Sequence, residues 1–148
     1  MENRLIICAG VVRRPGWKTL DIKGGDFEAD IPPLPKGVKE VLWDEIEWVH
    51  GVGTFYPWVA EEILTELYYV LAVGGKIVLE QPNFDIAKNR VEWTFGDPSH
   101  KDLLIMNRLA YTPGTLGDLL ERIGYHSIRE LPAKYHVPDR DFRMEAYR

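Results

Sequence analysis

The chain has 148 residues, of which 45% are hydrophobic and 28% are charged, a composition typical of a folded globular protein. We expect one domain spanning residues 1–148, because a chain of this length builds one core. The net charge of −5 disfavours nucleic acid as a partner. The single cysteine, Cys8, excludes an intrachain disulfide and favours a cytoplasmic location, and no apolar run is long enough for a membrane span.

The first element in chain order is an apolar run, Leu5–Cys8, which leads into a small-residue turn at Ala9-Gly10. A continuous apolar run indicates a strand of a parallel sheet that helices bury on both faces. A second short apolar run ends on an acid, Asp21. Glycine lets the backbone approach a ligand, and an acid at a neighbouring strand end can accept hydrogen bonds from a ribose. The pattern predicts a site for a nucleoside-containing cofactor.

The segment between these two strands is basic and short. About ten residues separate the strands, so we expect a loop there in place of a helix. Arg13, Arg14 and Lys18 lie close together in this region. They form either a local basic patch or, as we favour, a solvated loop. Cys8 is interpreted as a small core residue in preference to a nucleophile.

The middle of the chain reads as a strand–helix–strand unit. Phe27–Ile31 predicts a short third strand, and the alternation within Asp44–His50 predicts a fourth. Pro57–Leu71 has one broad apolar face and a proline in its first turn, as an amphipathic helix has. The glycines Gly74-Gly75 end the connection, and Lys76–Glu80 follows as a buried strand.

The C-terminal third predicts a loop, a helix and a hairpin. Residues 83–100 are polar and aromatic and have no long period, so we expect a loop over the sheet. Thr112-Pro113 begins a helix that Gly124 ends. Tyr125–Leu131 and Phe142–Tyr147 predict two antiparallel closing strands. The fold class is therefore α/β, a mainly parallel sheet with an antiparallel C-terminal strand.

Several of these segments resemble motifs of the class I S-adenosylmethionine-dependent methyltransferases. The stretch Leu71–Leu79, LAVGGKIVL, is similar to the glycine turn and strand that the family carries there. Five further segments resemble its first to fourth motifs and its reversed last strand: Cys8-Ala9-Gly10, Gly16–Ile22, Asp30-Ile31, Trp48-Val49-His50 and Arg140–Ala146. Phe95–His100 and Gly124-Tyr125 are similar to a compact bacterial and phage branch.

The resemblance implies a Rossmann-like methyltransferase fold with reduced N-terminal helices, and S-adenosylmethionine (SAM) as the cofactor. The Gly10 backbone would lie against the cofactor, Asp21 would bridge the ribose hydroxyls and Asp30 would lie near the adenine edge. The cofactor-binding residues it implies are Cys8, Ala9, Gly10, Asp21, Ile22, Asp30, Ile31 and His50. The reaction would transfer a methyl group to an unidentified acceptor, which is a small molecule, a sugar or a protein.

The catalytic candidates are His50 and Asn83, which follow the fourth and fifth strands. His50 is either a general base, since imidazole titrates near neutral pH, or a hydrogen-bonded structural histidine. Asn83 either positions an acceptor or forms a turn. Trp93 and Phe95 are candidates for an acceptor pocket, and His100 for a lid over it. The four histidines have no metal-ligand spacing, so we expect no metal site.

Two alternatives stay open at this point. The first motif has Cys8-Ala9 where the family favours glycine, and the helix after it is missing. These departures motivate a non-catalytic binding or scaffold module with the same fold. A dinucleotide enzyme would use the same strand ends but needs a fuller glycine fingerprint. A chain this short can also complete its pocket as a homo-oligomer.

Overall fold

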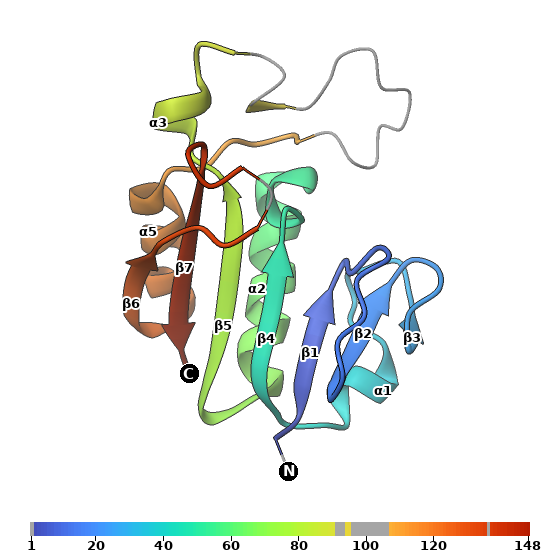
Figure 1. Ribbon diagram of the computed structural model, residues 1–148. Coiled ribbons are helices and arrows are strands. Elements are labelled where there is room, and N and C mark those ends of the chain that lie inside the picture. Colours follow the sequence, from blue (N-terminus) through green and yellow to red (C-terminus); the bar gives the residue numbers. More distant parts are fainter. Residues whose placement is uncertain (1, 91–93, 96–106, 136) are drawn as a thin grey trace.

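The computed structural model describes residues 2–90, 94–95, 107–135 and 137–148. Its strands are β1 (Arg4–Ile7), β2 (Trp17–Asp21), β3 (Phe27–Glu28), β4 (Trp43–Val49), β5 (Leu71–Pro82), β6 (His126–Leu131) and β7 (Asp141–Tyr147). They form one seven-stranded sheet in the order β3-β2-β1-β4-β5-β7-β6 (Figure 1). β1 to β5 pair in parallel, and β7 runs antiparallel to both β5 and β6. The predicted α/β class and reversed last strand are confirmed.

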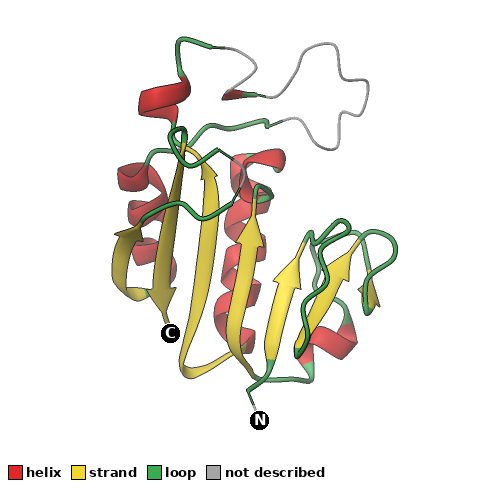
Figure 2. Cartoon of the chain, in the orientation of Figure 1, coloured by secondary structure: helices red, strands yellow, loops and turns green. Residues whose placement is uncertain are grey.

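The helices are α1 (Lys36–Lys39), the 3-10 turn η1 (Val52–Thr54), α2 (Pro57–Val70), α3 (Phe84–Ala87) and α5 (Pro113–Ile123). The two long helices, α2 and α5, lie side by side behind the sheet in Figure 2. Helix α5 begins and ends as the sequence predicts. Thr112 and Thr115 form a reciprocal capping box, and Gly124 ends the helix at a φ of +122°. None of the helices in these ranges is long and apolar enough to cross a membrane.

The core lies between the sheet and the two long helices. Alternate residues of the central strands point to this side, because successive side chains of a strand face opposite ways. The residues that meet there are Leu5 and Ile7 of β1, Ile46 and Trp48 of β4, Ile77 and Leu79 of β5, Ile63, Leu64 and Leu67 of α2, and Leu116 and Leu120 of α5. The core therefore uses one face of the sheet.

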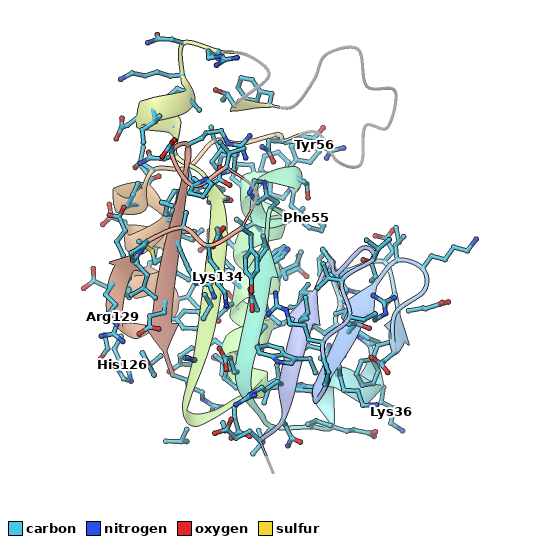
Figure 3. The ribbon with its side chains drawn as sticks, in the orientation of Figure 1. Lys36, Phe55, Tyr56, His126, Arg129 and Lys134 are labelled. Atoms are coloured by element: carbon cyan, nitrogen blue, oxygen red, sulfur yellow. The ribbon has the colours of Figure 1, made fainter. Side chains whose placement is uncertain are left out.

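The opposite face of the sheet is polar, and the loops predicted between β1 and β2 and between β6 and β7 cross it. β1 is buried on both faces, as predicted, but within the described residues loops cover the polar face, so the expectation of helices on that side is wrong. Figure 3 labels Lys134 in front of β5, on the loop between β6 and β7. The loop between β1 and β2 crosses the same face (Figure 1). This face carries Glu47 of β4, Glu80 of β5 and Arg143 of β7.

Three other expectations need correction. Gly74 and Gly75 lie inside β5, which is twelve residues long and begins directly after α2. The register of β4 against β5 shifts between Trp43 and Glu45, so an irregularity absorbs the glycine pair within the strand. The third strand has two residues where five were predicted. Residues 84–87 of the predicted loop form helix α3, because the Asn83 side chain caps its first turn.

Two buried carboxylates hold the loops on the polar face. Glu47, which is 2% exposed, accepts hydrogen bonds from Arg14 at 2.5 and 3.2 Å, and Arg143 approaches it at 3.5 Å. Burial acts to raise the pKa of Glu47, but Arg14 and Arg143 outweigh burial and hold this pKa below its ordinary value. Arg14 is thus an internal ion-pair partner, so the expectation of a basic patch or a solvated loop is wrong for Arg14, whereas Arg13 and Lys18 are exposed.

Glu80 holds the second loop in the same way. Its carboxylate accepts hydrogen bonds from the backbone N–H groups of Lys134 and Tyr135, at 3.0 and 2.5 Å, and from the Arg143 guanidinium at 2.9 Å. The Arg143 guanidinium therefore joins Glu80 to Glu47. One network ties both loops to the central strands.

We predict that Glu47→Gln lowers the free energy of unfolding at pH 7 by about 2 kcal/mol, because two guanidinium groups lose their shared counter-charge. Since the pKa of Glu47 is below its ordinary value of 4.5 in the folded protein, the wild type loses this stabilisation as the pH falls from about 4.5 through the folded pKa. The two stability curves should converge in acid. Urea unfolding at a series of pH values measures this.

The control is Glu40→Gln, which removes an exposed pair with Lys36 on α1. We expect a change below about 0.5 kcal/mol for that variant. A constant gap between wild type and Glu47→Gln down to pH 2.5 would contradict the assigned role of Glu47.

Candidate functional site

A cavity of about 720 Å³ opens at the carboxyl ends of the parallel strands. Ligands of α/β proteins bind at this edge, and the volume falls within the ordinary range for small-molecule sites. Its wall has two parts. The first part lies at the ends of β1, β2 and β3 and consists of Cys8, Gly10, Leu20, Asp21, Ile22, Ala29, Asp30 and Ile31. The second part lies after β4 and consists of His50, Gly51, Thr54, Phe55, Tyr56 and Val59, together with Arg108.

The turn after β1 is tied to the end of β2 by the Asp21 carboxylate. One oxygen of Asp21 accepts the Gly10 N–H at 2.5 Å, and the other accepts the Ile22 N–H at 2.7 Å. Gly10 has a φ of +53°, and a Cβ placed on it would meet nothing within 4 Å. Glycine therefore serves the backbone conformation and leaves the space above the turn open. Two hydrogen bonds to one carboxylate therefore join the turn to the end of β2, although the turn contains no helix.

Cys8 lies under this turn and stays a thiol. Its φ of +52° is left-handed, which is uncommon for a residue with a Cβ, and its N–H donates to the Leu20 carbonyl at 2.8 Å. Burial, together with the negative charge of Asp21, raises the pKa of Cys8 to about 12. The neutral side chain contributes apolar wall, in agreement with its interpretation as a packing residue.

His50 is held in place at the end of β4 by a buried acid. Its Nε2 lies 2.5 Å from the Asp141 Oδ2, and the other oxygen of Asp141 accepts a hydrogen bond from the Arg140 Nε at 2.5 Å. Burial acts to raise the pKa of Asp141, but His50 and Arg140 outweigh burial and keep this pKa below its ordinary value. The ionised Asp141 carboxylate therefore holds the imidazole ring in a fixed orientation at the cavity wall. The arrangement can receive a proton at the cavity wall.

The second part of the wall depends on a close approach between Trp48 and Gly51. A Cβ on Gly51 would lie 1.8 Å from the Trp48 Nε1, so the fully buried indole occupies that space. Phe55 packs edge-on against the same indole, with ring centroids 5.7 Å apart. Figure 3 shows Phe55 and Tyr56 beside the tip of β4.

Of the eight residues for which the sequence predicts cofactor contact, seven line this cavity: Cys8, Gly10, Asp21, Ile22, Asp30, Ile31 and His50. Ala9 does not; it is 5% exposed, and its carbonyl accepts the Val12 N–H within the turn. Asn83 also lies outside the lining, because its side chain caps α3 by accepting the Asp85 N–H at 3.1 Å.

Three further predicted residues do not belong to the described lining, and three residues of the site were not predicted. Trp93 and His100 lie outside the described residues, and Phe95 is not part of the lining. Arg108, Tyr56 and Asp141 were not predicted as site residues. Asp141 meets His50 across 91 positions of the chain, so no local pattern marks the pair. Within the described ranges, no three His, Cys, Asp or Glu side chains converge as a metal site requires.

The sequence matches no protein-family model and no curated protein. Its structure is similar to solved methyltransferases, over 97–99% of this chain. A SAM-dependent methyltransferase from Archaeoglobus fulgidus has 16% identity, a TM-score of 0.62 and 86% of its own chain covered. An O-methyltransferase family protein from Burkholderia thailandensis has 11% identity and a TM-score of 0.66, and 51% of its chain is covered. Human N-acetylserotonin methyltransferase in complex with SAM has 16% identity and a TM-score of 0.58, and 47% of its chain is covered. The chain has the Rossmann-like methyltransferase fold, and it spans about half the length of the last two.

We predict that two glycine-to-alanine substitutions change stability in opposite directions. Gly51→Ala should lower the free energy of unfolding by about 2–3 kcal/mol, because the new methyl group must displace the Trp48 indole. Gly117→Ala should raise it by about 0.5–1 kcal/mol. That glycine lies inside α5, where a Cβ would make ordinary contacts at 3.8 and 3.9 Å and alanine favours the helix. Urea denaturation measures both values, and a Gly51→Ala protein as stable as wild type would refute the close packing.

Proposed function

We propose that this protein is a SAM-dependent methyltransferase that acts on a small-molecule acceptor. The single observation that carries the proposal is the cavity at the carboxyl ends of β1 and β2. There the Asp21 carboxylate and the Gly10 turn form one hydrogen-bonded unit. The similarity to solved methyltransferases supports this use of the fold.

The residues of the first part of the wall fit the cofactor. Each Asp21 oxygen accepts one backbone N–H and keeps a further lone pair, so the carboxylate can also accept two ribose hydroxyls. The open space above Gly10 lets a ligand approach the protein backbone closely at this turn. Leu20, Ile22 and Ile31 supply apolar surface for a purine ring, and Asp30 can accept from its amino group. The neutral Cys8 thiol adds apolar wall without reacting.

When bound, SAM supplies an electrophilic methyl group that a lone pair of the acceptor can attack. The protein needs to align the two molecules and exclude water, and positioning of this kind accounts for much of a rate enhancement. A hydroxyl or ammonium acceptor must also lose a proton. We assign that proton to His50, whose ring lies at the cavity wall and is oriented there by the Asp141 carboxylate. Asn83 keeps its capping role at α3.

The proposal predicts saturable binding of S-adenosylhomocysteine, the demethylated product, in isothermal titration calorimetry. Asp21→Asn should weaken that binding by about tenfold to a hundredfold, because hydrogen bonds to a charged carboxylate contribute about 1.5–3 kcal/mol. The matched control is Asp85→Asn, which removes the same charge from an exposed position in α3 and should leave the affinity unchanged.

A thermal unfolding curve for each variant separates a lost contact from a lost fold. No binding of S-adenosylhomocysteine by the folded wild type at millimolar concentration would refute the methyltransferase proposal. It would leave the protein as a non-catalytic member of the fold.

A further inference from the structure

We propose that the acceptor is a planar aromatic molecule that carries an acidic group, with Arg108 binding the acid and Phe55 and Tyr56 flanking the ring. This inference rests on the proposed function, because it gives the second part of the cavity to the acceptor. The residues that support it are Arg108 and the aromatic residues that follow β4.

Arg108 is held at the cavity by the backbone around Gly53. The N–H of Arg108 donates to the Gly53 carbonyl at 2.6 Å, and the N–H of Leu109 donates to the same oxygen at 3.2 Å. The guanidinium also donates to the Thr54 carbonyl. A Cβ on Gly53 would lie 2.8 Å from the Leu109 carbonyl oxygen, so this close contact requires glycine. Backbone hydrogen bonds therefore fix the main chain of Arg108, and the Thr54 carbonyl orients its guanidinium.

The positive charge of Arg108 has no carboxylate partner among the described ion pairs. In the described part of the chain its guanidinium contacts the neutral Thr54 carbonyl and the Tyr56 ring, whose centroid lies 5.3 Å from the Arg108 Cζ. The acids of the cavity wall, Asp21 and Asp30, follow β2 and β3, whereas Arg108 joins the wall that follows β4. A planar guanidinium beside neutral groups suits a carboxylate, which it binds through two parallel hydrogen bonds.

Two aromatic residues, Phe55 and Tyr56, share the cavity wall with Arg108, and each packs against another ring. Phe55 packs on the Trp48 indole, and Tyr56 stacks on Trp58 with ring planes 2° apart and centroids 5.0 Å apart. Tyr56 is 52% exposed and Trp58 67% exposed, so the stack is open to solvent, and Tyr56 also lines the cavity. Rings fixed in this way favour a flat partner, because aromatic pairs gain interaction energy beyond the apolar area that they bury.

The test measures binding of 2-naphthoate, with S-adenosylhomocysteine binding measured separately on the same protein samples. We expect 2-naphthoate to bind with a Kd of about 1 mM, the affinity that ordinary ligand efficiency gives a molecule of its size. Methyl 2-naphthoate, which lacks the charge, should bind about tenfold more weakly. Decahydro-2-naphthoate keeps the charge but not the flat ring, and it should bind about threefold more weakly.

Two variants and two controls test the residues. Arg108→Gln should weaken 2-naphthoate binding about tenfold. Arg122→Gln removes an equal charge from the exposed side of α5 and should change nothing. Tyr56→Leu should weaken binding about threefold to tenfold. Tyr69→Leu removes an exposed ring elsewhere, on α2, and should also change nothing. None of the four should alter the affinity for S-adenosylhomocysteine.

The outcomes separate this inference from the proposed function. Failure of 2-naphthoate to bind, or equal binding of the acid and its ester, overturns the inference even where S-adenosylhomocysteine binds. Competition between 2-naphthoate and S-adenosylhomocysteine also overturns it, because the probe would then occupy the cofactor part. If Arg108→Gln weakens only S-adenosylhomocysteine, Arg108 binds the carboxylate of the cofactor and the inference is wrong. Binding of 2-naphthoate with no binding of S-adenosylhomocysteine supports the acid site and refutes the methyltransferase.

Discussion

The buried carboxylate of Glu47 is the constraint on which the polar face of this protein depends. β4 carries it into the centre of a sheet face where loops replace helices, and an ionised group there is unstable without partners. Arg14 comes to it from the loop after β1, and Arg143 comes from β7 and joins it to Glu80. The same contacts that neutralise Glu47 therefore fasten both loops to the sheet. A helix would cover such a face by apolar packing, whereas this chain covers it with charge pairs, whose stability depends on pH.

Fixing that first loop also fixes the cavity. The loop begins with the Gly10 turn, so one end is held by Arg14 against Glu47 and the other by Asp21 against the Gly10 N–H. Arg13 adds a third tie, since its guanidinium donates to the carbonyls of Gly10 and Gly24. Strand ends and loop hydrogen bonds thus hold this turn in place, whereas in many α/β proteins the corresponding turn leads into a helix N-terminus. The cavity keeps its floor although the segment between β1 and β2 is too short for a helix.

Local sequence patterns predicted what local forces determine. The cap at Thr112, the stop at Gly124 and the alternation that defines β4 act within a few residues, and the structure bears them out. Gly10 and Asp21 were predicted as neighbours because parallel strands place their carboxyl ends together. The pairs Arg14–Glu47 and His50–Asp141 join residues 33 and 91 positions apart, and no period in the sequence marks either. The prediction of a turn at Gly74-Gly75 is wrong because a glycine pair is compatible with both a turn and an irregular strand, and the pairing of β4 with β5 decides between them.

The two parts of the cavity are built by different means, and this has a consequence for function. The part after β1 to β3 depends on sheet register and on Asp21, so it is fixed by the fold itself. The part after β4 depends on how Gly51 and Gly53 let Trp48 and the segment of Arg108 approach the backbone. Substitutions at Phe55, Tyr56 or Arg108 change exposed or half-buried side chains without touching the Asp21–Gly10 unit. Under the proposed function, substitutions at these three positions would alter the choice of acceptor and leave the Asp21–Gly10 contacts to the cofactor in place.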